Sequence, residues 1–558
     1  MRPRVWAPAT GSPAVVTGEV EHPLQPDGDG WWRSPVDVPV GAGYAFRIDG
    51  DALPDPRSRS QPSGVHGPSA VDEVAFPWTD DGWRTPPFGS LATYELHIGT
   101  FSPEGTFVGA IPYLDRLREL GVGAISVMPV AEFAGARGWG YDGVDLWAAH
   151  HAYGGAAGLR RLVDAAHARG LAVILDVVYN HLGPEGNYLA RFGPYFNDRH
   201  QTPWGAAVNY DGEGARGVRD FVIENAITWL RDCHLDGLRL DAVHAIVDLS
   251  RPHVLAEMRR RVDREVGEER WLIAECDLLD PRIAGEWGLT AQWSDDIHHA
   301  IHSLLTGERS GYYQAFGGVE QLVHALRNGY VREPYGPVLG RPDGRRLVAY
   351  AQNHDQVGNR ARGDRLCHLV SPGRSRIAAA LVLLGPFAPM VFMGEEWAAS
   401  TPFPFFSSHT DPTIGAATSE GRRREFAAFG WRPDEIPDPQ DPATYEGAKL
   451  RWSERDQGAH GEMLRFHEAL LELRREHPGV SSGDLGRVEE RHGPDWLVLE
   501  HGGLVVACNW GSSAVALPVR GDLLLAGGDT ATVSGDRLRL GPDDVAVLTN
   551  GASGQHDG

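Results

Sequence analysis

Three carboxylates have the residue types and the spacing to act together in acid–base and nucleophilic chemistry. Asp241 closes the segment GLRLD, Glu275 closes WLIAE, and Asp355 lies in QNHDQ. Asp241 and Glu275 are 34 positions apart, about one strand-and-helix unit, so they would end neighbouring strands about 4.8 Å apart. Carboxyl groups about 5–5.5 Å apart are typical of retaining glycosidases, in which one attacks the anomeric carbon and the other protonates the leaving oxygen.

The neighbouring residues indicate which carboxylate does what. Arg239 and Asp241 are two positions apart, so on a strand they share a face, and the guanidinium holds Asp241 ionised as a nucleophile requires. Glu275 follows the apolar residues 272–274 and must keep its proton until it donates it. For any single carboxylate, a buried ion pair that closes the fold is the alternative. The three together favour catalysis.

Polar side chains at other predicted strand ends fit a sugar ligand. The segment DVVYNH holds Asp176, Asn180 and His181, and His354 directly precedes Asp355. Asn180, His181 and His354 suit hydrogen bonds to sugar hydroxyls. For Asp176, orienting its neighbours is an equally good interpretation.

Aromatic residues support the same ligand class. Trp139 and Tyr141 lie in GWGYDG, Trp204 lies in the loop 183–214, and the chain contains 17 tryptophans. Aromatic faces stack on the apolar C–H faces of sugars. Core packing is the alternative for each of these residues.

The elements that must position these residues predict a (β/α)₈ barrel, an α/β fold. Short apolar strands alternate with amphipathic helices, such as 157–169 and 218–232, and a barrel carries its active site at the carboxyl ends of its strands. The expected strands are 92–97, 123–128, 171–176, 236–241, 271–275, 290–293, 347–351 and 389–393.

The chain divides into three expected domains. Residues 1–86 are rich in Pro, Gly, Val and Trp without a helical period, which predicts an N-terminal β-sandwich of the carbohydrate-binding kind. Residues 87–478 form the catalytic barrel with insertions, and residues 479–558 read as a C-terminal β-sandwich.

Composition excludes several classes of partner. With 75 acidic and 52 basic residues, the net charge of −23 repels nucleic acids and anionic membranes. The apolar run 377–394 contains Pro386 and Pro389, so a helix followed by a strand explains it better than a membrane span. Four scattered cysteines without a CxxC pair, and an N-terminus without a signal core, predict a cytoplasmic protein.

Other catalytic chemistries lack their motifs. The sequence has no GxSxG, HExxH, post-strand GxGxxG or P-loop pattern. The doublets His150–His151 and His298–His299 are better explained as loop or sugar contacts than as metal ligands. We therefore expect no cofactor and no metal site.

The motifs DVVYNH, GLRLDAVH, IAE and QNHD, in this order, resemble the four motif regions of the α-amylase family of glycoside hydrolases. The resemblance implies that Asp241 is the nucleophile, Glu275 the general acid/base and Asp355 the transition-state stabiliser. It also implies a sugar surrounded by Arg239, His181 and His354, with Tyr141 stacked beneath it. It does not imply calcium.

Within this family, the chain is similar to the branch that cleaves the α-1,4 bond next to the terminal trehalose unit of maltooligosyltrehalose. The segments behind this similarity are 94–107, 138–155, 193–212 and 292–308, together with the connector 55–69. The implied pathway partner is maltooligosyltrehalose synthase, which makes the substrate. The similarity implies three stretches of sugar contacts, 239–244, 295–299 and 354–359. These stretches extend the set of implied sugar contacts by His244, Asp295, Asp296, His298, His299, Gln356 and Asn359.

Two other functions compete with this one. A glycogen branching or debranching enzyme of the same family shares the catalytic motifs, and the loops 183–214 and 292–308 favour the trehalose-releasing branch over it. A non-catalytic glucan-binding protein that keeps the barrel should have lost at least one of the three carboxylates, and none is lost.

Overall fold

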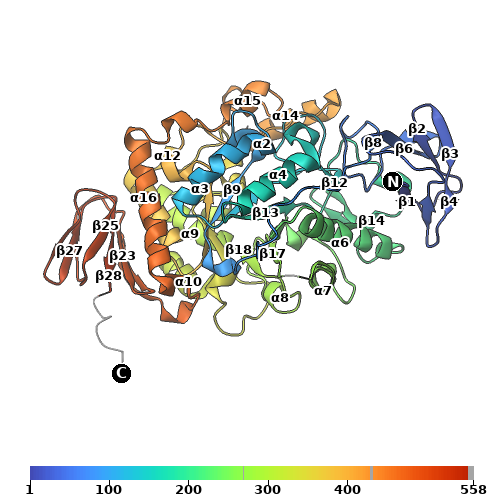
Figure 1. The fold of residues 1–558 in the computed structure, drawn as a ribbon. Coiled ribbons are helices and arrows are strands. Elements are labelled where there is room, and N and C mark those ends of the chain that lie inside the picture. Colours follow the sequence, from blue (N-terminus) through green and yellow to red (C-terminus); the bar gives the residue numbers. More distant parts are fainter. Residues whose placement is uncertain (268, 428–430, 551–558) are drawn as a thin grey trace.

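The computed structural model describes residues 1–267, 269–427 and 431–550. Figure 1 shows a central barrel with a sheet region at each end, the N-terminal one on the right and the C-terminal one on the left. The barrel is the part that positions the expected site.

Eight parallel strands close the barrel in the order β10-β13-β16-β17-β18-β19-β20-β9. Each strand lies within one residue of its predicted bounds, so the predicted barrel is confirmed. The strands are β9 Thr93–Leu96, β10 Ala124–Val127, β13 Ala172–Val177, β16 Gly237–Leu240, β17 Trp271–Ala274, β18 Ala291–Trp293, β19 Leu347–Tyr350 and β20 Ala388–Phe392.

The barrel strands are buried on both faces, which is why their sequences are almost continuously apolar. Ile174, Trp271, Ile273 and Tyr350 belong to one core cluster of barrel residues. Phe88 packs edge-on against Trp271 with ring centroids 5.3 Å apart and belongs to the same cluster.

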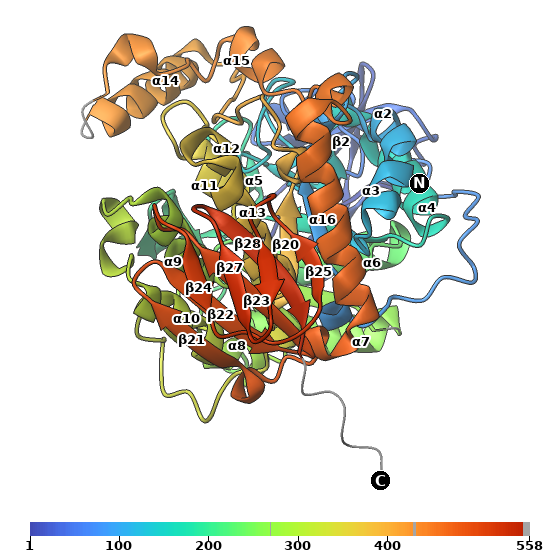
Figure 2. The same ribbon diagram turned by 90° about the vertical axis from the view of Figure 1, so that its left-hand side faces the viewer.

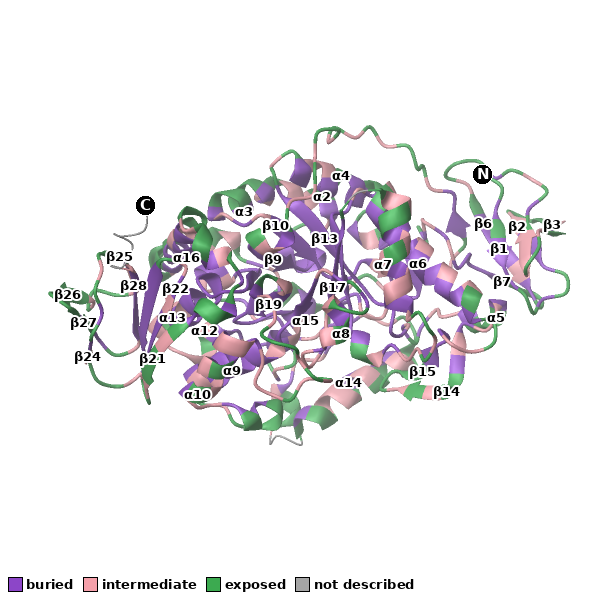
Figure 3. Cartoon of the chain, turned by 90° about the horizontal axis from the view of Figure 1, so that it is seen from below, coloured by how far each residue is buried: buried purple, intermediate pink, exposed green. Residues whose placement is uncertain are grey.

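Helices surround the barrel, and Figure 3 shows that the buried residues gather at its centre. The longer helices are α3 Leu114–Leu120, α4 Gly155–His167, α6 Ala215–Asp232, α7 Val254–Val266, α9 Asp295–Thr306, α10 Val319–Asn328, α13 Pro372–Leu383, α14 Pro412–Ala427 and α16 Gly458–Glu476. The shorter ones are α1 Ile98–Phe101, α2 Phe107–Ala110, α5 Leu189–Phe192, α8 Pro281–Ala284, α11 His354–Gly358, α12 Leu366–Leu369 and α15 Pro442–Gly447.

The apolar run 377–394 is a helix followed by a strand, as expected. α13 is buried because it contacts both β20 and the C-terminal strand β28, Asp544–Thr549. No helix within the described part of the chain is long and apolar enough to cross a membrane.

The N-terminal sheets pair strands from residues 4–70. The first sheet has the order β1-β5-β4, and the second has β3-β2-β6-β7 with β8 added on β6. Their bounds are β1 Arg4–Trp6, β2 Ala14–Thr17, β3 Val20–Pro23, β4 Gln25–Pro26, β5 Trp31–Arg33, β6 Gly43–Ile48, β7 Asp51–Leu53 and β8 Ser69–Ala70.

The C-terminal sheets enclose a core of their own, with Val498, Leu538 and Leu548 among its buried residues. Figure 2 shows these sheets beside α16. One sheet is β21 Glu489–Gly493, β22 Trp496–His501, β23 Leu504–Asn509, β28 and β25 Leu523–Ala526, and the other is β24 Val515–Leu517, β27 Arg537–Leu540 and β26 Thr532–Ser534.

Two small hairpins extend loops near the carboxyl ends of the barrel strands. The first pairs β11 Ala131–Glu132 with β12 Asp145–Ala149, and the second pairs β14 Phe196–Thr202 with β15 Gly205–Val208.

Candidate active site

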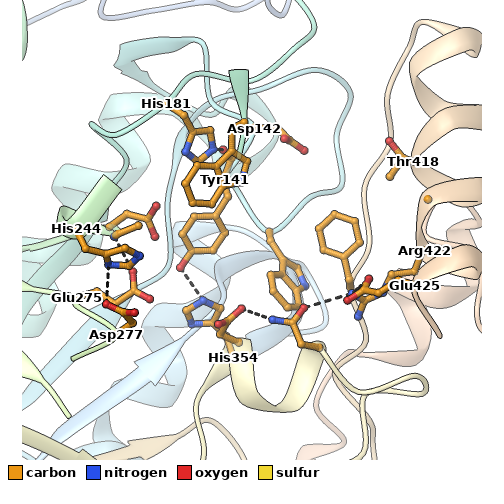
Figure 4. Close-up of a pocket in the computed structure, with 18 of the residues that line it drawn as sticks. Tyr141, Asp142, His181, His244, Glu275, Asp277, His354, Thr418, Arg422 and Glu425 are labelled. Atoms are coloured by element: carbon orange, nitrogen blue, oxygen red, sulfur yellow. Dashed lines mark hydrogen bonds and ion pairs between the residues drawn. The ribbon is translucent and has the colours of Figure 1, made fainter. Parts of the chain in front are cut away.

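A cavity of about 600 Å³ opens where the barrel strands end. Figure 4 shows His244, Glu275 and Asp277 on one side of it, Thr418, Arg422 and Glu425 on the other, and Tyr141 and His354 between. Of the residues predicted from sequence, the lining contains Trp139, Tyr141, His181, Arg239, Asp241, His244, Glu275, Asp295, His354, Asp355 and Asn359.

The buried guanidinium of Arg239 on β16 connects the carboxylates. Its Nη1 donates to Asp241 Oδ1 at 2.7 Å and to both oxygens of Asp176, at 2.9 and 2.8 Å. Its Nη2 lies 3.0 Å from Glu275 Oε2. The same guanidinium lies over Trp293, 4.4 Å from the ring centroid. One cation therefore holds the two expected catalytic carboxylates at the ends of neighbouring strands.

Asp241 receives donors on both carboxylate oxygens. Arg239 donates to Oδ1, and the Asn180 amide donates to Oδ2 at 2.6 Å and to the Asp241 backbone oxygen at 2.9 Å. A carboxylate that accepts on both oxygens suits attack rather than proton donation.

Glu275 has a different environment. Burial raises the pKa of Glu275, and the negative charges of Asp241 and Asp355 add to the rise although Arg239 opposes it. The Ala242 N–H donates to Glu275 Oε2 at 2.6 Å and fixes that oxygen. A raised pKa suits a group that gives up a proton during the reaction.

Asp355 lies on α11 and is more accessible than Asp241. Asn359 Nδ2 donates to Asp355 Oδ1 at 2.6 Å, and Arg422 Nη1 donates to Asn359 Oδ1 at 3.3 Å. Arg422 also pairs with Glu425, at 3.1 Å. These contacts link the third carboxylate to α14 across the cavity (Figure 4).

Tyr141 and His354 form a hydrogen-bonded floor. The Tyr141 hydroxyl donates to Asp176 Oδ2 at 2.7 Å and lies 2.8 Å from His354 Nε2, while His354 Nδ1 lies 2.6 Å from Glu95 Oε1. Burial lowers the pKa of His354, but the Glu95 carboxylate outweighs this effect and raises the pKa above its ordinary value. Burial raises the pKa of Asp176 to about 7. Asp176 lies behind the lining, where it orients Arg239 and Tyr141.

Aromatic rings bound the cavity further out. His181 stacks on the half-exposed Trp204, with centroids 4.6 Å apart and planes at 12°, and donates from Nε2 to the Tyr141 backbone oxygen at 3.1 Å. Trp139 also lines the cavity and stacks on Phe403 with centroids 5.5 Å apart.

Two further predicted contacts line the cavity near Glu275. His244 Nδ1 lies 3.7 Å from Asp277 Oδ1 at the rim. Asp295 accepts a hydrogen bond from the Tyr350 hydroxyl, and burial raises the pKa of Asp295 to about 7.

Other predicted contacts lie behind the lining. Asp296 accepts from the N–H groups of Val331 and Arg332 at 2.6 and 2.7 Å. His298 Nδ1 is 2.8 Å from the Ala351 oxygen and its Nε2 is 3.2 Å from the Tyr313 hydroxyl.

His299 and Gln356 both contact Tyr312. His299 stacks on the Tyr312 ring with centroids 4.8 Å apart, and Gln356 Oε1 accepts from its hydroxyl at 3.3 Å. His299 and Gln356 therefore support the turn Gly311–Ala315, and neither contributes to the cavity lining.

The lining also contains residues that sequence reasoning missed. Asp277 was signalled by its place just after Glu275, and Asp142 by its place just after Tyr141. The wall formed by α14 had no such signal, because this helix lacks an apolar stripe. The missed residues are Asp142, Asp277, Phe405, Thr418, Gly421, Arg422 and Glu425.

Two groups of the described residues bring metal-ligating atoms within 4.8 Å of one another: Glu132 with His150 and His151, and His244 with Cys276 and Asp277. In the first, Glu132 Oε1 already accepts from His151 Nδ1 at 2.6 Å. In the second, Asp277 Oδ1 already accepts from the Tyr335 hydroxyl at 2.9 Å.

Comparisons with known proteins identify a matching family model, similar sequences and a similar structure. The family model "Alpha amylase, catalytic domain" matches residues 53–204. Malto-oligosyltrehalose trehalohydrolase of Mycobacterium tuberculosis is 46% identical over 98% of both chains, and that of Arthrobacter ramosus is 47% identical over 94% of this chain and 95% of the other. A crystal structure from Salmonella typhimurium, described as a candidate alpha amylase, superposes with a TM-score of 0.90 at 37% identity, covering 98% of this chain and 97% of the other.

Proposed function

Because the chain belongs to the malto-oligosyltrehalose trehalohydrolase family of α-amylase-type glycoside hydrolases, we propose that it cleaves the α-1,4-glucosidic bond next to the terminal trehalose unit of maltooligosyltrehalose and releases trehalose. The observation that supports the chemistry best is the single guanidinium of Arg239 between Asp241 and Glu275. A close carboxyl pair in unlike environments is what a retaining mechanism needs.

The proposed reaction is a double displacement. Asp241 attacks the anomeric carbon while Glu275 protonates the oxygen of the leaving trehalose. The glycosyl–Asp241 ester is then hydrolysed by a water that Glu275, now ionised, deprotonates, and the product keeps the α configuration. Glu275 ends the cycle protonated again.

The surrounding residues distort and hold the sugar. We propose that Asp355 binds hydroxyls of the sugar ring that approaches the oxocarbenium-like transition state. The Tyr141 ring lies beneath that sugar, and the His354 and His181 rings, which line the cavity, contact it from the sides. Tyr141 is suited to this task because its own hydroxyl is engaged on both sides.

The position of Glu275 supports a proposal for which part of the substrate occupies each end of the cavity. Glu275 must reach the oxygen between the cleaved sugar and trehalose, so trehalose occupies the side where His244 and Asp277 lie (Figure 4). The glucan chain then extends toward α14, where Arg422 and Glu425 offer hydrogen-bonding groups.

The alternatives have less support. The near-full-length relatives named above are trehalohydrolases, which disfavours a branching or debranching enzyme. A non-catalytic glucan-binding protein would not need the intact set of carboxylates around Arg239. We also propose that a maltooligosyltrehalose synthase supplies the substrate, and that the enzyme works in the cytoplasm, where its four unpaired cysteines stay reduced.

Product analysis on two substrates tests the proposal. We expect fast release of trehalose from maltotriosyltrehalose and little cleavage of maltopentaose, which has the same number of glucose units. Nuclear magnetic resonance of the fresh products should show the α anomer of maltotriose. Equal cleavage of both substrates would indicate a general α-glucanase, and β product would exclude the retaining mechanism.

A further inference from the structure

The helix α14 forms one wall of the cavity but has little apolar packing to hold it. Of its described residues, only Gly415, Ser419 and Phe426 are buried. Figure 2 shows α14 at the rim of the molecule, away from the helices that cover the barrel. Because a buried apolar face is the usual anchor of a surface helix, this wall must be positioned by other contacts.

A buried carboxylate holds the residues that lead into α14. Glu185, in the loop after β13, has a side chain only 3% exposed. Its oxygens accept from the backbone N–H of Thr410 at 3.0 Å and of Asp411 at 3.0 Å, and the Thr410 hydroxyl donates to it as well. His409 Nδ1 lies 3.2 Å from Glu185 Oε2. A single side chain thus binds three consecutive residues ahead of the helix.

The cluster formed by Glu185, His409, Thr410 and Asp411 also contacts the cavity lining. His409 is buried, and its Nε2 lies 3.7 Å from Asp142 Oδ2. Asp142 lines the cavity beside Tyr141 (Figure 4). His409 therefore lies between Glu185 and Asp142, the carboxylate that lines the cavity.

The N-terminal region closes the cluster from outside. His66, which precedes β8, lies with Nε2 3.3 Å from Glu185 Oε1 and with Nδ1 2.8 Å from the Tyr188 hydroxyl. The segment that carries the N-terminal sheets thus contacts the carboxylate that holds the pocket wall.

We propose that Glu185 is a positioning residue for the hydrolysis of maltooligosyltrehalose: it fixes the start of α14, and with it the wall that carries Thr418 and Arg422, and it couples the N-terminal sheets to that wall. The inference rests on the proposed function, since the wall is assigned to the glucan chain. Glu185 is absent from the cavity lining, so its loss changes substrate binding more than the chemical step.

The substitution Glu185→Gln tests this at nearly constant volume. Every neighbour described above donates to Glu185, and the glutamine amide turns one acceptor oxygen into a donor that faces other donors. With maltotriosyltrehalose we expect KM to rise about tenfold, the effect of losing one hydrogen bond to a charged group, while kcat changes little. Hydrogen exchange of residues 409–427 should become faster, and exchange of the barrel strands should not.

Glu454→Gln is the matched control. Glu454 accepts from the backbone N–H of Ser400 at 2.8 Å and from its hydroxyl at 2.7 Å, the same pair of donors that Thr410 offers Glu185, and it is absent from the cavity lining. This variant should keep the wild-type KM. His66→Ala should raise KM by less than Glu185→Gln, because it removes one of several donors.

The outcomes are decisive in either direction. A folded Glu185→Gln variant with wild-type KM and wild-type exchange overturns the proposal, and so does a fall in kcat at constant KM. If that variant does not fold, Thr410→Val removes one donor and should give the same selective rise in KM; wild-type constants there overturn the proposal. If the wild-type enzyme releases no trehalose, the proposed function is contradicted instead. Hydrogen exchange of the Glu185→Gln variant then still tests whether Glu185 holds the start of α14.

Discussion

Asp241 accepts hydrogen bonds from Arg239 and Asn180, and an asparagine side chain in its place would keep its shape. Asp241→Asn should therefore fold, yet an amide cannot form the glycosyl ester, so kcat should fall by roughly a thousandfold or more. Steady-state trehalose release measures this. Asp296→Asn is the control, because that carboxylate lies behind the lining and its loss should leave kcat near wild type. Wild-type turnover in Asp241→Asn would remove this residue from the nucleophile role.

In the proposed mechanism, Glu275 controls how the activity responds to alkaline pH. Its pKa is raised above the ordinary value of about 4.3 by burial and by the charges of Asp241 and Asp355. Because the protonated form donates, kcat/KM should fall as pH rises through this raised pKa. Asp355→Asn removes one of the charges that raise it, so the basic limb of the residual activity should move to lower pH. A limb that stays in place, measured across the same pH series, would contradict the assignment.

Single residues also show where sequence reasoning succeeds and where it stops. Asp241 and Glu275 could be predicted because each directly follows a strand whose apolar pattern is unambiguous. Asp295 lines the cavity but Asp296 does not, because a helix begins at Asp295 and successive residues on a helix point about 100° apart. His298 and His299, three and four positions later, share the helix face of Asp295 but lie one turn further along α9, and neither lines the cavity. A motif locates a segment, but the helix phase and the position along the helix together decide which side chain faces the cavity.

At the scale of secondary-structure elements, burial explains which helices and strands can be predicted from the sequence. The barrel strands are buried on both faces, so their apolar runs were visible in the sequence. α14 has few buried residues, and polar contacts hold it, such as those of Arg422 with Gly358 and Asn359 and those of the donors around Glu185. These contacts join residues far apart in the sequence: Arg422 and Asn359 are 63 positions apart, and Glu185 and Thr410 are 225 positions apart. No local sequence pattern predicts contacts of this kind.

The opposite end of the barrel should carry stability and not catalysis. Asp236, just before β16, accepts from Trp83 Nε1 at 2.8 Å, the Thr85 hydroxyl at 2.7 Å, His167 Nε2 at 2.9 Å and the Val173 N–H at 2.8 Å. This carboxylate attaches the segment that leads from the N-terminal sheets to the barrel. Asp236→Asn puts a donor among these donors and should destabilise the fold by about 2 kcal/mol. Thermal unfolding should show a lower Tm with an unchanged kcat, and a lower kcat at unchanged Tm would contradict this.

At the scale of the whole molecule, the helix α13 joins the C-terminal sheets to the barrel. Ser371 Oγ and Arg374 Nε, at the start of this helix, donate to the Asp543 carboxylate at 2.7 and 2.8 Å. Between them, Gly373 lets the backbone of Asp543 approach so closely that a Cβ would lie 1.8 Å from its carbonyl oxygen. The join between barrel and C-terminal sheets therefore depends on the absence of one side chain.

Gly373→Ala should force these two parts apart. Overpacking of this kind costs about 1–3 kcal/mol, so Tm should fall by several degrees. The kcat on maltotriosyltrehalose should stay the same, because Gly373 and Asp543 do not line the cavity. Gly447→Ala is the matched control: Gly447 also lies in a helix, a Cβ there would meet nothing within 4 Å, and alanine is the better helix former, so Tm should hold or rise slightly. Calorimetry of both variants distinguishes a steric join from a general effect of replacing glycine. Equal Tm values for Gly373→Ala and wild type would show that the C-terminal sheets shift on the barrel without penalty.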